Sequence, residues 1–142
     1  MKYPAKFERT DGSKILITFP DVEEAVSQGD DEQDAVDMAQ DALVTWFAHC
    51  IRHGKAINPP SQPKGRKYRM IGLPAMVSAK VELYTAFKAS GLTKAELGRR
   101  LAIPKTNVER LFEFKNHTRL DQLEAAFRVL GKDMSISISE AA

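Results

Sequence analysis

The front of the chain alternates apolar and polar positions. This alternation predicts short strands over 3–9, 14–19 and 26–29. Asp11-Gly12 lies between the first two, and this dipeptide is a strong signal for a β-hairpin. Residues 68–73 predict one further strand, after a change of pattern described next.

Helical spacing replaces the alternation after Gly29. Asp30 is the predicted N-cap of a helix, with Gln33 completing a capping box. Apolar residues over 35–50 recur at helical spacing and form a broad stripe, and Gly54 is the expected terminator. The order β-β-β-α-β predicts a small sheet with the helix packed on one face.

The back of the chain reads as four helices followed by a strand. Pro74 and Gly91 bound the first helix, and Thr93 with Glu96 opens the second through another capping box. The third covers about 105–112. The fourth covers about 119–130 and ends at Gly131, with four residues expected to face inward: Leu120, Leu123, Phe127 and Leu130. Residues 134–139 alternate Met or Ile with Ser, which predicts a half-buried strand.

The segment 57–66 separates these two parts, because three prolines and a glycine favour an extended connection. We therefore expect an α+β protein with a β-β-β-α-β domain over 1–73 and an all-α domain over 74–142 that ends in the strand. No signal peptide or membrane-spanning stretch is evident, so we expect a cytoplasmic protein.

Charge is distributed unevenly along the chain. Residues 1–63 carry 6 basic and 11 acidic side chains, residues 64–73 carry four basic and no acidic ones, and 74–142 carry 11 basic against 8 acidic. An acidic front and a basic back suggest different partners, with nucleic acid the usual partner of the basic part.

The stretch 94–112 has the spacing of a helix-turn-helix. Its apolar positions supply a small shared core: Leu97, Leu101, Ile103, Val108 and Leu111. Six polar residues in and after it are candidates for DNA binding: Lys94, Lys105, Thr106, Asn107, Arg110 and Lys115. The alternative is a small helical bundle with a solvated polar face. Many such turns carry Ala in the first helix and Gly in the turn, whereas Gly98 and Ala102 reverse that order.

Nearly the whole sequence resembles the HicB antitoxins of bacterial type II toxin–antitoxin pairs, in their helix-turn-helix variant. Seven segments carry the resemblance: Lys2-Tyr-Pro-Ala-Lys-Phe-Glu8, Ile17-Thr-Phe-Pro-Asp21, Ser27-Gln-Gly-Asp30, Ala39-Gln-Asp-Ala-Leu43, Ile57-Asn-Pro-Pro-Ser61, Leu73-Pro74 and Lys80-Val81. The resemblance implies that the front domain has a partial ribonuclease-H-like fold and binds HicA, a small toxin that cuts mRNA. It also implies that the back domain dimerises and represses the operon by binding double-stranded operator DNA.

An acidic front could cover the basic RNA-binding face of such a toxin. The candidate toxin-binding residues are Asp21, Glu23, Glu24 and Asp30. Residues 134–139 either cap their own domain or pair with the same strand of a second chain. We favour pairing, and hence a homodimer, and pairing of dimers into tetramers stays open. The competing hypothesis is a stand-alone helix-turn-helix regulator whose α/β domain senses a small ligand.

Enzymatic and metal-dependent functions are not favoured by the sequence. A two-metal nuclease needs converging carboxylates, and none of the acidic residues Glu8, Asp11, Asp21, Asp30 and Asp37 lies mid-strand in the first predicted strand. His49 and His53 flank Cys50 on a helix, but no fourth ligand is evident. We therefore expect no enzyme activity, no cofactor and no metal.

Overall fold

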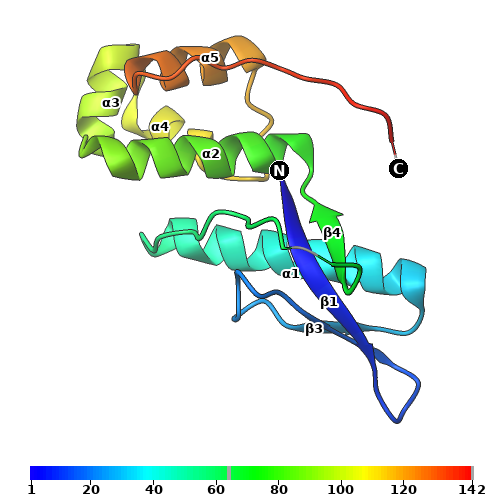
Figure 1. The fold of residues 1–142 in the computed structure, drawn as a ribbon. Coiled ribbons are helices and arrows are strands. Elements are labelled where there is room, and N and C mark those ends of the chain that lie inside the picture. The colour runs from blue at the N-terminus through cyan, green and yellow to red at the C-terminus, as the bar shows by residue number, and fades with distance from the viewer. Residues whose placement is uncertain (64, 142) are drawn as a thin grey trace. The chain divides into compact units, whose positions relative to one another are not determined.

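The computed structural model describes residues 1–63 and 65–141. The chain divides into two compact units, Met1–Ser78 and Ala79–Ala142. The first unit contains four strands and one long helix: β1 (Lys2–Arg9), β2 (Ile15–Thr18), β3 (Ser27–Gly29), α1 (Glu32–Arg52) and β4 (Tyr68–Gly72). The strands form one antiparallel sheet in the order β3-β2-β1-β4. Figure 1 shows this unit, with β1, β3, β4 and α1 labelled. The expected β-β-β-α-β order is thus observed, in a mixed α+β protein.

The core of this unit lies between the sheet and α1. The sheet contributes buried residues that alternate in β2 (Ile15 and Ile17) but are consecutive in β1 (3–5). Helix α1 contributes its apolar stripe: Ala35, Ala39, Leu43, Phe47 and Cys50. The rings of Tyr3 and Phe47 lie 5.1 Å apart between these layers. A Cβ added to Gly29 would lie 2.5 Å from the backbone of Ala35, so only glycine allows this approach of β3 to α1.

Pro4 lies inside β1 without breaking the sheet. The Leu73 N–H donates to the Met1 carbonyl at 3.1 Å, so the β1 residues that bond to β4 are the odd-numbered ones, in alternation. The nitrogen of Pro4 faces the other side, where pairing with β2 begins only at Lys6. The missing N–H therefore costs no bond between strands.

The predicted hairpin between the first two strands is confirmed, and its left-handed residue is Ser13 (φ 66°). The predicted helix cap needs correction. The helix N-cap is Asp31, whose carboxylate accepts from the Asp34 N–H at 2.8 Å, and not Asp30. The Asp34 carboxylate accepts in return from the Asp30 N–H at 2.8 Å. The capping pair is displaced by one residue because Asp31 and Asp34 satisfy the free N–H groups at this spacing.

The second unit contains no strand among its described residues, 79–141. The helices at and after the boundary are α2 (Ala75–Ser90), α3 (Lys94–Leu101), α4 (Lys105–Leu111) and α5 (Leu120–Val129). Its buried core includes Val81, Tyr84, Phe87, Leu97, Val108, Leu111, Leu123 and Phe127. Leu101 and Ile103 are only partly buried. Leu120, expected to face inward, is 56% exposed because it occupies the first turn of α5.

The predicted C-terminal strand is absent from the single chain. The chain turns after α5 at Gly131 (φ 76°) and continues to residue 141 without helix or strand (Figure 1). Ile136 and Ile138 are 64% and 90% exposed. A strand requires a neighbour to receive its backbone hydrogen bonds, and the described part of this unit offers none.

Candidate functional site

Two short helices and a tight turn form the framework of the candidate site. The hydroxyl of Thr93 accepts from the Glu96 N–H at 3.1 Å and caps α3, as the sequence predicts. The helix ends in Ala102, which adopts the left-handed conformation at φ 56° and ψ 44°. The Ile103 N–H closes the turn on the Gly98 carbonyl at 3.0 Å, and α4 begins after Pro104. Ala102 thus takes the backbone conformation usually reserved for glycine.

Gly98 brings α4 close to α3. An added Cβ at this position would lie 3.1 Å from Val108 Cγ2 and 3.2 Å from the Ile103 carbonyl oxygen. A side chain here therefore requires Val108 or the turn at Ile103 to shift by a few tenths of an ångström. This contact explains the glycine in the first helix.

The six predicted DNA-binding residues are not equally accessible. Lys105, Thr106, Arg110 and Lys115 are exposed, while Asn107 is partly buried. Lys94 forms an ion pair with Glu109 at 3.0 Å, which joins the start of α3 to α4. Four of the six side chains are therefore free to contact DNA. The ammonium of Lys94 can contact DNA only next to the carboxylate of Glu109.

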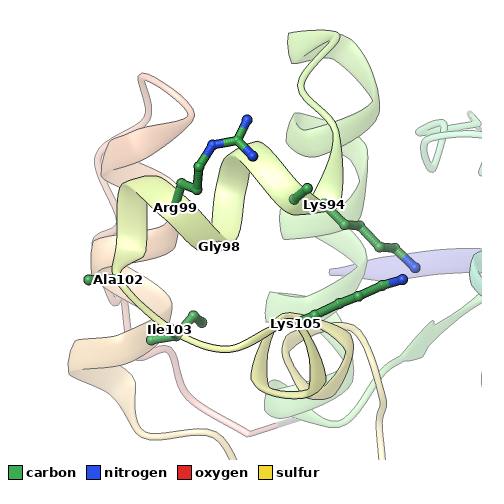
Figure 2. A pocket seen from close by; sticks show the side chains of 7 residues that line it. Lys94, Gly98, Arg99, Ala102, Ile103 and Lys105 are labelled. Atoms are coloured by element: carbon green, nitrogen blue, oxygen red, sulfur yellow. The ribbon is translucent and has the colours of Figure 1, made fainter.

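A shallow basic hollow lies between α3 and the start of α4. It has a volume of about 350 Å³ and is lined by Lys94, Ala95, Gly98, Arg99, Ala102, Ile103 and Lys105. Figure 2 shows Lys94 and Lys105 extending to the same side, while Arg99 points away from them. Sequence reasoning did not include Arg99, although its position on the polar side of the predicted helix could have indicated it.

Lys80 on α2 is a further residue that sequence reasoning missed. Its side chain has no exposed surface, and its ammonium donates to the backbone carbonyls of Arg110 (2.9 Å), Glu113 (2.7 Å) and Asn116 (2.8 Å). These bonds tie down the end of α4 and the turn that follows it, where Arg110 and Lys115 are located.

Lys80 is charged at neutral pH despite its burial. Burial lowers the pKa of its ammonium to about 8, against the opposing effect of the Glu113 carboxylate. Below that pKa the ammonium has three N–H donors, and the three carbonyls accept hydrogen bonds from it. A cation at a helix C-terminus is also favoured by the helix dipole.

The four acidic candidates in the first unit separate into two kinds. Asp21 is engaged within the fold, since its carboxylate accepts from the Ser61 N–H (2.8 Å) and hydroxyl (2.9 Å). Asp30 forms an exposed ion pair with Lys14. Glu23 and Glu24 are exposed, and the ion pairs found among the described residues include neither of them. The structure thus leaves two carboxylates available on the loop after β2.

His49, Cys50 and His53 do not form a metal site in the structure. The two imidazole rings lie 4.4 Å apart, but Cys50 is buried in the core. Among residues 1–63 and 65–141, no group of three or more His, Cys, Asp or Glu side chains is placed to hold a metal ion. Of the helices in that same part of the chain, none is long and apolar enough to cross a membrane.

Several known proteins are similar to this chain. It is 33% identical over 138 residues to Antitoxin HicB 1 of Photorhabdus laumondii, across 97% of this chain and 87% of that protein. It is 34% identical over 136 residues to Antitoxin HicB of Escherichia coli, across 96% of this chain and 98% of that one. The crystal structure of the N-terminal domain of Burkholderia pseudomallei antitoxin HicB matches with 20% identity and a TM-score of 0.45, over 52% of this chain and 99% of that chain.

The resemblance seen in the sequence is confirmed by these relatives and by a family match. The sequence model of the HicB-like antitoxins of bacterial toxin–antitoxin systems matches residues 2–82. More than half of the chain lies in that match, and the two relatives extend the similarity over nearly its full length. The chain therefore belongs to the HicB-like antitoxin family.

Proposed function

We propose that this chain is a non-enzymatic, cytoplasmic antitoxin. It binds and neutralises a small HicA-type mRNA-cleaving toxin through its first unit, and represses its own operon through the α3–α4 framework. The observation that carries the proposal is the extent of the family match. Residues 2–82 nearly coincide with the compact unit Met1–Ser78, so the part that defines an antitoxin family is one folded body.

The acidic loop after β2 supports the toxin-binding half of the proposal. Glu23 and Glu24 are exposed, whereas Asp21 and Asp30 are engaged by Ser61 and Lys14. A toxin that binds RNA needs a basic surface, and exposed carboxylates are complementary in charge to such a surface. We therefore narrow the candidate toxin contacts to Glu23 and Glu24.

The α3–α4 framework supports the DNA-binding half. The short α4 presents Lys105, Thr106 and Arg110 as exposed side chains, in the manner of a recognition helix of a helix-turn-helix. Lys94, which is ion-paired with Glu109 of α4, and the exposed Lys115 after α4 are candidates for phosphate contacts. Such readers bind as dimers on two half-sites, so the proposal includes a homodimer on operator DNA.

Coexpression with the neighbouring small gene tests the toxin-binding half. We expect the gene product alone to stop growth, and the full-length chain to restore growth and form a stoichiometric complex. The double variant Glu23→Lys/Glu24→Lys should weaken the complex at least tenfold, because like charges then face each other. The matched control Glu82→Lys changes an exposed carboxylate outside the first unit and should leave the complex unchanged.

Absence of both rescue and complex would reject the antitoxin proposal. The chain would then be a regulator whose first unit senses a small ligand. A complex insensitive to the double variant would keep the antitoxin role and move the toxin contact away from this loop.

A further inference from the structure

The C-terminal tail after α5 is exposed although its pattern is that of a strand. The tail follows the left-handed Gly131 and has no secondary structure over residues 132–141. Its Ile136 and Ile138 are among the most exposed large apolar side chains of the described chain, at 64% and 90%. Leu120 of α5, in the same unit, is 56% exposed. Together these side chains leave apolar surface uncovered in the second unit.

Alternation in the tail assigns its side chains to two faces. In an extended strand, successive side chains point to opposite sides. One face therefore carries the even-numbered residues, which are apolar with one charge at each end: Lys132, Met134, Ile136, Ile138 and Glu140. The other face carries only polar residues: Asp133, Ser135, Ser137 and Ser139.

The tail is complementary to itself in an antiparallel arrangement. If a two-fold axis passes through Ile136, that residue meets the partner's Ile136, and Met134 meets the partner's Ile138. The same register places Lys132 opposite the partner's Glu140, so that an ion pair closes each end. A shift of one residue would set isoleucine against serine across the pair. A shift of two residues would separate Lys132 from the partner's Glu140.

We propose that residues 132–140 pair antiparallel with the same segment of a second copy of this chain, on a two-fold axis through Ile136. Strand pairing with a copy satisfies backbone groups for which the described part of the second unit offers no strand partner. Pairing then gathers Ile136 and Ile138 of both copies on one apolar face, and a ribbon of two strands needs such a face packed against a helix to be stable. Leu120 of α5 supplies exposed apolar surface for that packing in the same unit. This inference rests on the dimer included in the proposed function and names the surface that joins its two copies.

Measuring the molecular mass of the protein in solution, without DNA or toxin, tests whether the tail joins two copies of the chain. We expect the parent chain at twice its mass of 15.8 kDa. Ile136→Lys puts two ammonium groups opposite each other on the axis and should raise the dimer dissociation constant at least tenfold. The matched control Ser137→Lys adds the same charge to the polar face and should leave the dimer intact.

The end charges test the register. Lys132→Glu places two carboxylates opposite each other at both ends of the ribbon and should weaken the dimer. Adding Glu140→Lys to that variant restores opposite charges and should recover it. A double variant no tighter than the single one contradicts the register.

Oxidative cross-linking measures the same register by distance. Directly opposed residues have Cα atoms about 4.5–5.5 Å apart, within disulfide range, so Ile136→Cys should form a covalent dimer. Ser139→Cys lies about 20 Å from its counterpart in this register and should not. The native Cys50 can remain in both variants, because it is buried and burial raises the pKa of its thiol.

Three results would overturn the inference: a monomeric parent chain, a dimer unaffected by Ile136→Lys, or cross-linking at Ser139→Cys equal to that at Ile136→Cys. The proposed function can fail separately. A monomeric Ile136→Lys variant that binds the operator like the parent would reject dimeric recognition and leave the tail surface in place. A parent dimer that resists Ile136→Lys would reject the surface and leave the proposed function in place.

Discussion

At the scale of single residues, Ala102 and Ser13 occupy the left-handed region of backbone conformation. A side chain there costs roughly 1–2 kcal/mol, because Cβ crowds the following carbonyl oxygen. At Ala102 this unfavourable conformational energy falls in the turn that orients α4 against α3. The neighbouring Gly98 is held as glycine by the side chain of Val108. The contact with Val108 therefore explains Gly98, whereas Ala102 is a source of strain that nothing in the structure explains.

Two single substitutions, Ala102→Gly and Gly98→Ala, should change the free energy of unfolding in opposite directions. Ala102→Gly relieves the left-handed strain and should raise the free energy of unfolding by about 0.5–1 kcal/mol, after the greater flexibility of the unfolded chain is deducted. Gly98→Ala introduces a Cβ at 3.1 Å from Val108 Cγ2, and this crowding should outweigh the gain in helix propensity and lower the free energy of unfolding by about 0.5–1 kcal/mol. Urea unfolding of both variants measures these changes. Equal changes of one sign would contradict the explanation.

At the scale of elements, some helix ends are stabilised by side chains close in the sequence and others by side chains far away in the sequence. The start of α1 is capped locally, by Asp31 on the Asp34 N–H. The end of α4 is capped by Lys80, which lies 30 residues before Arg110. Both arrangements satisfy backbone groups that a helix leaves unpaired at its ends.

Asp31→Ala and Asp30→Ala distinguish the cap from its neighbour. Loss of the Asp31 carboxylate should cost about 1 kcal/mol of unfolding free energy, because an N–H at the start of α1 loses its acceptor. Asp30→Ala removes only an exposed ion pair with Lys14 and should cost less than about 0.5 kcal/mol. Thermal or urea unfolding of the two variants gives the comparison. A larger loss at Asp30 would restore it as the cap.

Lys80→Met tests the buried ammonium. The variant keeps the apolar stem but removes three hydrogen bonds to carbonyls, of which those of Arg110 and Glu113 each keep a backbone N–H donor. The free energy of unfolding should therefore fall by about 2–3 kcal/mol. Lys88→Met, an exposed position on the same helix, is the control and should stay within about 0.5 kcal/mol. A change at Lys80 no larger than that at Lys88 would show that the carbonyls find other donors.

At the scale of the whole molecule, the proposed function assigns toxin binding and DNA binding to different compact units. Met1–Ser78 matches the antitoxin family, and the exposed cations of α4 belong to Ala79–Ala142. Substitutions in one unit should then change one binding activity and spare the other. Charge supports this division, since the front of the chain is acidic and the back is basic.

Lys105→Ala and Arg110→Ala should weaken operator binding without affecting the toxin complex. Each lost phosphate contact lowers the slope of log affinity against log salt by about 1, and a lost base contact costs about 1–3 kcal/mol. Arg128→Ala, an exposed cation on α5, is the matched control. Operator titrations at several salt concentrations and the toxin pull-down measure both activities. Unchanged operator binding in both variants would remove α4 as the recognition helix.

Local features of this protein were predictable from its sequence alone. Strand alternation, the spacing of α1, the Thr93 cap and the positive φ at Gly54, Gly91 and Gly131 each depend on residues within a few positions of one another. The family was predictable as well, because its segments recur in order along the chain. Candidate cations could be named for the same reason, since exposure follows from position on a predicted helix.

Only the tertiary structure decided which polar groups are already engaged. Lys80 meets carbonyls 30 to 36 residues away, and Asp21 holds Ser61 across 40 positions. Leu120 is exposed and the tail is unpaired because burial depends on what packs against a segment, and a periodic pattern does not specify that neighbour. Periodicity determines which face of an element is apolar, whereas the contacts between distant segments determine whether that face is covered.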